Sequence, residues 1–196
     1  MEYRILGKTG LKISRMGFGG IPIQKIDAEG TKALMKRLCE EGINFIDTAR
    51  AYTCSEEYLG YALDGMRDKF IIATKSGAQS KEDMLKDIDV SLKNLRTDYI
   101  DLYQLHNPKQ DNLDFVLSDD GALAALKEAK AAGKIGHIGI TTHSTEVFEK
   151  ALSLDCIETI MFPYNIVESQ GEELIKKMYR EEYRLYRYEA SGGRCD

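Results

Sequence analysis

The stretch GINFIDTARAYTCSEEYLG, residues 42–60, predicts a buried strand, a loop and the start of a helix. The segment 44–46 suits a parallel strand, and Asp47 follows at the carboxyl end of that strand, where α/β folds place their chemistry. Tyr52 comes after a short loop. An Asp and a Tyr at this spacing are more often a helix cap and a surface aromatic, so spacing alone does not make them a catalytic pair.

The second half of this stretch predicts a helix that begins near Ser55. A serine hydroxyl can cap the first backbone N–H groups of a helix, and Ser55 stands where such a cap is expected. Glu56 and Glu57 follow in the first turn, where the positive end of the helix dipole favours acidic side chains. We therefore expect a strand, an active-site loop and a helix in succession.

The composition indicates one globular domain with an ordinary core. The chain has 196 residues, of which 43% are hydrophobic and 9% aromatic. Its 27 Lys and Arg against 32 Asp and Glu give a net charge of −5 without a basic block, which argues against a nucleic-acid partner. No apolar run approaches signal-peptide length or the ~20 residues that span a bilayer, so we expect no membrane partner and a cytoplasmic location.

The cysteines and histidines form no metal motif. The cysteines are scattered without a C-x-x-C pair, so we expect free thiols and no metal site. His137 and His143 lack metal-ligand spacing, and we interpret them as structural or peripheral. The four cysteines are Cys39, Cys54, Cys156 and Cys195.

Strands and helices are predicted to alternate six times after an N-terminal hairpin. The hairpin is indicated by short alternating segments on both sides of a turn at 7–10. The first helix has Asp27 as its expected N-cap and Gly42 as its stop. The expected elements are a strand ending at 17–20, a helix at 27–41, strands at 44–46 and 70–75, a helix at 81–94, a strand at 99–106, a helix at 121–132, a strand at 137–141, a helix at 145–152, a strand at 159–162 and a helix from 172.

This alternation predicts a parallel sheet covered by helices, because a parallel strand must be reached through a crossover. A doubly wound sheet and a barrel both satisfy the pattern. The doubly wound dinucleotide-binding sheet carries G-x-G-x-x-G after its first strand, whereas residues 17–20 read GFGG. We therefore choose the barrel. The glycines at 17–20 suit either a tight turn or the close approach of a flat ligand.

Polar side chains stand at the ends of three successive predicted strands. Asp47 and Tyr52 follow one strand, Lys75 ends the next and His106 ends the one after that. The carboxyl ends of barrel strands converge on one face, so these four residues should lie together. A single strand-end lysine or a lone histidine is usually structural, but four such residues together favour a catalytic site.

The motifs around these residues resemble the signature of the aldo/keto reductases. They read I-D-T-A at 46–49, A-Y at 51–52, A-T-K at 73–75 and Q-L-H at 104–106. The resemblance extends over residues 1–177. It implies an α/β fold, an incomplete TIM (β/α)8 barrel with an N-terminal β-hairpin and about six of the eight β/α units, since a complete barrel takes about 250 residues.

The resemblance also implies an oxidoreductase that transfers hydride from NAD(P)H to an aldehyde or ketone. Tyr52 would be the general acid. A phenol with an ordinary pKa of about 10 is a weak donor at neutral pH unless its anion is stabilised, and the ammonium of Lys75 would supply that stabilisation. Asp47 would balance the charge of Lys75, and His106 would donate a hydrogen bond to the substrate oxygen.

The family binds NADP(H), or NAD(H) in some branches, across the barrel mouth. Three residues of this chain depart from the family pattern: Thr141 and Thr142 stand where Ser-Asn is common, and Met161 stands in place of a glutamine. The cofactor-binding residues that the resemblance implies are Gly19, Gly20, Thr141, Thr142, Tyr164 and Asn165.

The family pattern ends early in this chain. From residue 178 the sequence has neither helical nor strand periodicity, where the family has a seventh strand. We divide the chain into a partial barrel at 1–177 and an aberrant tail at 178–196, interpreted as a frameshift product, because a shifted reading of permitted codons gives GFIAMKPLAGG. The resemblance is greatest to the branch with an iron–sulfur-binding C-terminal segment, and we expect this chain to lack that segment. Open barrel edges would favour self-association.

The sequence leaves two other functions open. One is an inactive truncated fragment, and the other is a non-catalytic nucleotide-binding barrel, as in the channel-associated relatives of the family. The presence of Asp47, Tyr52, Lys75 and His106 favours the enzyme. The sequence does not identify the carbonyl substrate.

Overall fold

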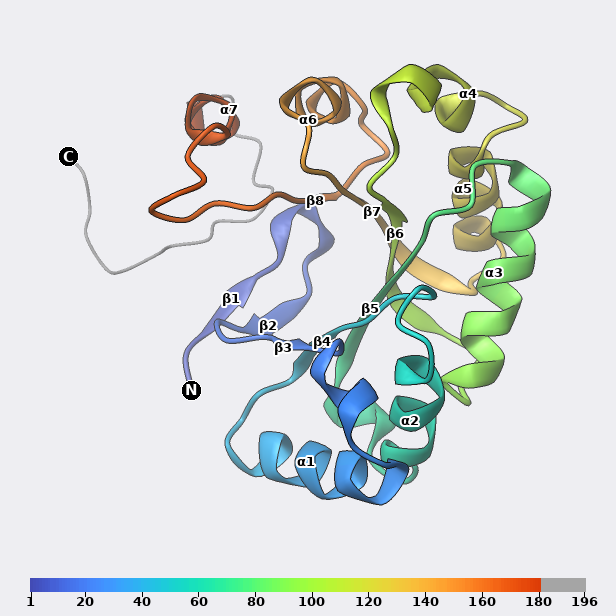
Figure 1. The fold of residues 1–196 in the computed structure, drawn as a ribbon, viewed down its shortest axis with the longest axis vertical. Helices are drawn as coiled ribbons and strands as arrows, with labels where there is room; N and C mark the ends of the chain where they lie inside the picture. Colours follow the sequence, from blue (N-terminus) through green and yellow to red (C-terminus); the bar gives the residue numbers. More distant parts are fainter. Residues whose placement is uncertain (181–196) are drawn as a thin grey trace.

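A parallel sheet of six strands forms the centre of the molecule. The structure is a computed structural model that describes residues 1–180. The strands pair in sequence order, each parallel to the next, and the sheet curls as part of a barrel (Figure 1). Their bounds are β3 (Phe18–Gly19), β4 (Phe45–Asp47), β5 (Ile71–Ser76), β6 (Ile100–His106), β7 (Ile135–Thr141) and β8 (Thr159–Met161). A doubly wound sheet reverses its strand order, so the unbroken order from β3 to β8 confirms the prediction of an incomplete barrel.

Helices cover the outer side of the curved sheet (Figure 1). The predicted helices agree with the structure to within one residue at the ends that were assigned, because their apolar residues recur at helical spacing. A short helix, α4, was not predicted. The helices are α1 (Ala28–Glu40), α2 (Ser55–Ala62), α3 (Lys81–Asn94), α4 (Leu113–Leu117), α5 (Ala122–Ala131), α6 (Thr145–Leu152) and α7 (Glu172–Arg180), with single 3-10 turns at Pro22–Lys25, Arg67–Lys69 and Gln110–Asn112.

The N-terminal hairpin lies on the inner side of the sheet, opposite the helices (Figure 1). Its strands β1 (Tyr3–Ile5) and β2 (Lys12–Ser14) are antiparallel and are joined through the 3-10 turn Gly7–Thr9, as the sequence predicted. Leu6 of this hairpin is buried against Phe45, Ala73 and Leu102 of the sheet.

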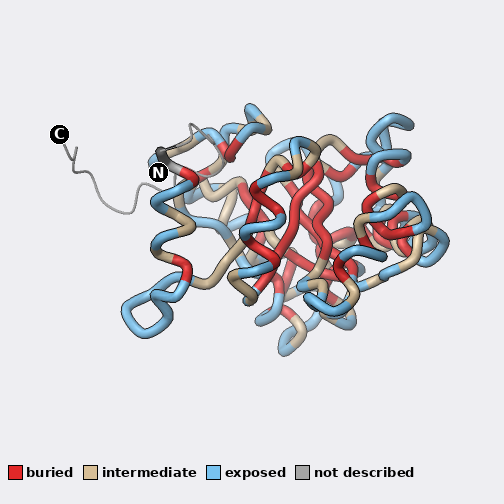
Figure 2. The backbone as a smooth tube through the Cα atoms, turned by 90° about the horizontal axis from the view of Figure 1, so that it is seen from above, coloured by how far each residue is buried: buried red, intermediate tan, exposed pale blue. Residues whose placement is uncertain are grey.

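Side chains alternate between the two faces of each strand and divide the interior into two parts. Outward-facing residues such as Ile46, Ile72 and Tyr103 join the helices in the larger core. Inward-facing residues near the amino ends of the strands pack on the hairpin. Figure 2 shows buried backbone running along the central strands and exposed segments around them. The inner face at the carboxyl ends is therefore left for polar side chains.

Local signals at the helix ends were predicted in part. Asp27 caps α1 by accepting a hydrogen bond of 2.7 Å from the backbone N–H of Gly30, and Gly42 follows that helix with a φ of 76°, both as predicted. The prediction that Ser55 caps α2 is wrong. The N-cap is Cys54, which makes no side-chain cap, and the Ser55 hydroxyl instead donates to the carbonyl oxygen of Gly20 at 3.0 Å.

Helix α7 crosses the predicted domain boundary after residue 177 and continues to Arg180. Met178 is buried in the larger core. The rest of the tail that the sequence predicted to be aberrant, 181–196, lies outside the described residues. Within residues 1–180, no helix has the length and apolar character that crossing a membrane requires.

Candidate active site

Four predicted residues meet on the inner face of the sheet at the carboxyl ends of its strands. Asp47 is the last residue of β4, Lys75 is the penultimate residue of β5, and His106 is the last residue of β6. Tyr52 follows β4 in the loop that leads to α2. The structure brings all four side chains together, as the strand-end positions predicted.

A buried ion pair forms the floor of the site. The ammonium nitrogen of Lys75 lies 2.5 Å from a carboxylate oxygen of Asp47, and the two side chains are 3% and 17% exposed. Lys75 also donates a hydrogen bond of 2.9 Å to the carbonyl oxygen of Thr48. The ammonium is thus held between a side-chain oxygen of Asp47 and the backbone oxygen of the next residue, Thr48.

The aromatic rings of Tyr52 and His106 lie beside this ion pair. The ammonium of Lys75 is 4.8 Å from the ring centroid of Tyr52, within range of a cation–π contact. The rings of Tyr52 and His106 are 6.1 Å apart at an interplanar angle of 89°, which is an edge-to-face arrangement. Tyr52 is held by a backbone hydrogen bond of 3.0 Å to the carbonyl oxygen of Ala49.

Burial shifts the pKa values of two residues in the site. Burial raises the pKa of Asp47 above its ordinary value, although the charge of Lys75 and hydrogen bonds from Lys75 and Gln104 act in the opposite direction. Burial, followed by the charges of Lys75 and His143, lowers the pKa of His106. His106 is therefore a neutral imidazole at neutral pH, with one N–H to donate. His143, predicted to be structural or peripheral, is near enough to affect it.

Gln104 belongs to the site, although the sequence analysis did not single it out. Its side-chain N–H donates a hydrogen bond of 3.2 Å to the second carboxylate oxygen of Asp47. Its own amide oxygen is buried and has no hydrogen-bond partner among the described residues. Gln104 stands two positions before His106 on β6, and the alternation of a strand could have placed both on the same face.

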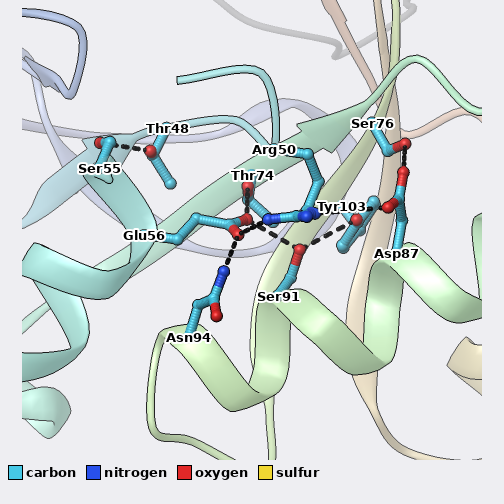
Figure 3. Close-up of polar contacts among 10 residues, drawn as sticks. All are labelled: Thr48, Arg50, Ser55, Glu56, Thr74, Ser76, Asp87, Ser91, Asn94 and Tyr103. Atoms are coloured by element: carbon cyan, nitrogen blue, oxygen red, sulfur yellow. Dashed lines mark hydrogen bonds and ion pairs between the residues drawn. The ribbon is translucent and has the colours of Figure 1, made fainter. Parts of the chain in front are cut away.

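Glu56 has a different environment from the one expected for a residue in the first turn of a helix. It is 1% exposed and accepts hydrogen bonds from side chains of the loop, β5 and α3 (Figure 3). The predicted place of Glu56 in the first turn of α2 is confirmed, but the sequence analysis did not foresee its burial or these partners. Its partners come from distant parts of the sequence, which a local motif does not reveal.

The two glycines assigned to cofactor binding differ in their surroundings. Gly19 is exposed, and a Cβ atom there would have no neighbour within 4 Å. Gly20 is buried, and a Cβ atom there would lie 2.7 Å from the Ser55 hydroxyl and 3.1 Å from the Thr48 hydroxyl. Packing therefore requires glycine at 20, and a role of either glycine in cofactor binding stays a prediction.

The remaining predicted cofactor residues are at the ends of β7 and β8. Thr141 ends β7, and its hydroxyl accepts a hydrogen bond of 3.1 Å from the N–H of Asn107 while it can still donate one. The hydroxyl of Thr142 is bonded to the backbone of Ser144. Tyr164 is 52% exposed. The amide oxygen of Asn165 accepts from two N–H groups of its own turn, which leaves less of this side chain for a ligand.

A metal ion has no evident site here. Among residues 1–180, no group of three or more His, Cys, Asp and Glu side chains is placed to hold one. His137 instead contacts Glu158 through a nitrogen–oxygen distance of 2.8 Å.

Comparison with known proteins identifies relatives of this chain. The family model described as "Aldo/keto reductase family" matches residues 15–193. Aldo-keto reductase YhdN of Bacillus subtilis is 34% identical over 194 residues, which is 89% of this chain and 57% of YhdN. L-galactose dehydrogenase of Arabidopsis thaliana is 35% identical over 167 residues, or 78% of this chain and 52% of that enzyme.

Solved structures show the same similarity. The holo form of aldo-keto reductase AKR11C1 from Bacillus halodurans superimposes with a TM-score of 0.83 and 32% sequence identity, over 94% of this chain and 64% of that one. The chain thus spans between about half and two thirds of the length of these relatives. The family model matches most of the sequence, and the fold agrees with that of the solved relatives. The chain belongs to the aldo/keto reductase family.

Proposed function

We propose that the chain carries the catalytic site of an NAD(P)H-dependent reductase of aldehydes or ketones, with Tyr52 as its general acid. The observation that carries this proposal is the buried Lys75–Asp47 ion pair with the ring of Tyr52 directly beside its ammonium. Both the ion pair and the aromatic ring lie at the carboxyl end of the barrel strands, where barrel enzymes have their active sites.

Reduction of a carbonyl places negative charge on its oxygen, and this oxygen must then receive a proton. The phenol of Tyr52 donates that proton, and the ammonium of Lys75 stabilises the phenolate that is left. Asp47 balances the ammonium in a site where an unpaired buried charge would be costly. Tyr52 and Lys75 thus act as one unit.

His106 orients the substrate in this proposal. Because burial lowers its pKa, His106 is neutral and donates one N–H without bringing a second positive charge next to Lys75. Its ring is edge-on to that of Tyr52, so both residues can address one oxygen atom. The donor pair would fix the carbonyl oxygen in place.

A nicotinamide cofactor is compatible with the residues around the site. The open backbone at Gly19, the hydroxyl of Thr141 and the exposed ring of Tyr164 suit a flat polar ring with an amide group. When bound, reduced nicotinamide supplies the hydride for the carbonyl carbon. The holo form of the Bacillus halodurans relative supports cofactor binding in this fold. NADP(H) is proposed ahead of NAD(H) from the family resemblance, and a cytoplasmic location stays a prediction from the sequence.

The proposal is tested by following the absorbance of NADPH with an aromatic aldehyde such as nitrobenzaldehyde. The wild-type chain should consume NADPH only when the aldehyde is present, and Lys75→Met should lose this activity. Lys86→Met is the matched control, because Lys86 is exposed on α3 and its ion-pair partners within residues 1–180 are neighbouring acids of its own helix. Aldehyde-dependent consumption at the same rate in Lys75→Met would contradict the proposal.

A further inference from the structure

A second polar network lies on the outer face of β5, behind the candidate active site. Glu56 of α2 is its centre, and its carboxylate accepts hydrogen bonds of 2.8 Å from Thr74, 2.8 Å from Ser91 and 3.3 Å from Asn94 (Figure 3). Arg50 adds an ion pair of 2.9 Å. These donors supply hydrogen bonds to a carboxylate that is 1% exposed and out of reach of solvent.

Arg50 connects two carboxylates on different helices. Besides Glu56 of α2, its guanidinium lies 3.4 Å from Asp87 of α3. Burial acts against the charge of Arg50, but hydrogen bonds and attraction from Glu56 and Asp87 prevail and raise its pKa. A guanidinium has several N–H donors in a fixed plane, so it can engage both acids at once, which a lysine cannot do in the same geometry.

The network holds β5 on both sides of Lys75. Thr74 donates to Glu56, and Ser76 donates to Asp87. Because side chains alternate along a strand, Thr74 and Ser76 point toward the helices while Lys75 points to the inner face. Fixing the two neighbours restricts the position of Lys75 without touching its ammonium.

The same network reaches the loop that carries Tyr52. The backbone N–H of Arg50 donates a hydrogen bond of 2.9 Å to the carbonyl oxygen of Lys75, and Thr48 bonds likewise to Ala73 at 2.8 Å. The side chain of Arg50 then anchors the loop to α2 and α3. Tyr52 follows Arg50 by two residues. Arg50 therefore connects the loop that carries Tyr52 to strand β5, which carries Lys75.

We propose that Arg50, through Glu56 and Asp87, is a positioning residue that keeps the phenol of Tyr52 next to the ammonium of Lys75. This inference rests on the proposed function in so far as Tyr52 and Lys75 perform the chemistry. Arg50 itself contacts neither reacting group. A displacement of about 1 Å in catalytic groups can lower a rate by about 100-fold, so a positioning residue of this kind matters to catalysis.

The test compares Arg50→Met with Arg50→Lys in the full chain. Arg50→Met removes both ion pairs, and Arg50→Lys keeps a cation that can serve one of the two carboxylates. Arg37→Met is the matched control, because Arg37 is 69% exposed on α1 and its one ion pair among the described residues is with Glu41, four positions further along. Circular dichroism and thermal melting establish which variants are folded at the temperature of the measurement.

The first readout is the nuclear Overhauser effect between the ring protons of Tyr52, assigned with Tyr52→Phe, and the side-chain methylene next to the Lys75 ammonium. It should be lost in folded Arg50→Met, partly recovered in Arg50→Lys and unchanged in Arg37→Met. A structural residue that only stabilises the fold would lower the melting temperature without altering this contact. An unchanged contact in folded Arg50→Met would overturn the inference. If Arg50→Met does not fold, Arg50→Lys decides in its place: a weakened contact supports the inference and a wild-type contact overturns it.

The second readout is aldehyde reduction with NADPH. Arg50→Met should lower kcat by about 100-fold with little change in KM for the aldehyde, because orientation and not binding is lost. If the wild-type chain does not reduce the aldehyde at all, that result counts against the proposed function alone. The Tyr52–Lys75 contact is measured without substrate, so it still decides whether Arg50 is a positioning residue.

Discussion

Asp47→Asn should destabilise the fold, because it leaves the ammonium of Lys75 buried without a carboxylate. The two side chains are 3% and 17% exposed and 2.5 Å apart. After the substitution, the carbonyl oxygen of Thr48 still accepts a hydrogen bond from Lys75 at 2.9 Å. Removal of one partner of a buried ion pair typically costs about 3–5 kcal/mol. Because the hydrogen bond to Thr48 is retained, we expect the free energy of unfolding to fall by about 3 kcal/mol, the lower end of this range.

The burial of the Asp47 carboxylate makes a contribution of opposite sign to the stability change in Asp47→Asn. Burial raises the pKa of Asp47, so the charged form is penalised, and asparagine removes that penalty. The ammonium of Lys75 is the more deeply buried of the two charges. The cost of leaving it without a counter-charge is therefore larger than the gain from removing the buried carboxylate. Asp47→Asn combined with Lys75→Met removes both charges and should be more stable than Asp47→Asn alone.

The assay is urea unfolding followed by circular dichroism. A loss of about 3 kcal/mol in the free energy of unfolding lowers the urea midpoint by about 1–3 M for m values of about 1–3 kcal/mol/M. In a thermal melt of the same sample it lowers Tm by roughly 6–12 °C for a chain of this size. Lys86→Met is the control, since its ion pair with Glu82 is exposed and should leave the midpoint unchanged within error. The reasoning is refuted if Asp47→Asn unfolds at the midpoint of this control, or if the double variant is less stable than the single one.

Three further predictions follow from the packing and the pKa shifts. Burial lowers the pKa of His106, so this imidazole binds a proton more tightly in the unfolded chain than in the folded one. As the pH falls from about 7 to about 5.5, the wild type should therefore lose more free energy of unfolding than His106→Asn. Equal losses for the two proteins in urea unfolding would argue against this prediction. Gly60→Ala should lower the free energy of unfolding in urea by about 1–3 kcal/mol or more, because its Cβ would lie 2.1 Å from the carbonyl oxygen of Asn94. Gly77→Ala, whose Cβ would have no neighbour within 4 Å, should leave the stability unchanged. Gln104→Leu removes one hydrogen bond and one unpartnered buried oxygen, so its urea stability should stay within about 1 kcal/mol of the wild type, and a loss of several times that size would contradict this.

The order of strands and helices could be predicted because it depends on local pattern. The bounds of α3 and α6 were predicted to the residue, and Gly42 was predicted as the stop of α1, where the structure gives it a positive φ. The positions of Asp47, Lys75 and His106 at strand ends then followed from the parallel arrangement, since parallel strands place their carboxyl ends on one side. Short α4 has too few residues to show a helical period.

The contacts that were missed join residues far apart in the sequence. Ser55 is of a residue type that often caps helices, but it is the first residue of α2, one position after the N-cap. Its hydroxyl bonds to Gly20, which is 35 positions away. Glu56 binds partners 18 to 38 positions away on β5 and α3. Such partners depend on how the helices are placed on the sheet, and local sequence carries no record of that placement. The turn of Asn165 is local and could have been predicted, because asparagine often accepts hydrogen bonds from the N–H groups that follow it.

The central claim is that Tyr52 donates the proton to the substrate oxygen, and Tyr52→Phe tests it most directly. The substitution keeps the ring beside Lys75 and His106 and removes only the hydroxyl. NADPH-dependent reduction of the aldehyde should fall by about 100-fold or more, while the NADPH dissociation constant from fluorescence titration stays close to that of the wild type. Tyr99→Phe, a tyrosine just before the opposite end of β6, should retain full activity. Reduction at the wild-type rate by Tyr52→Phe would contradict the account.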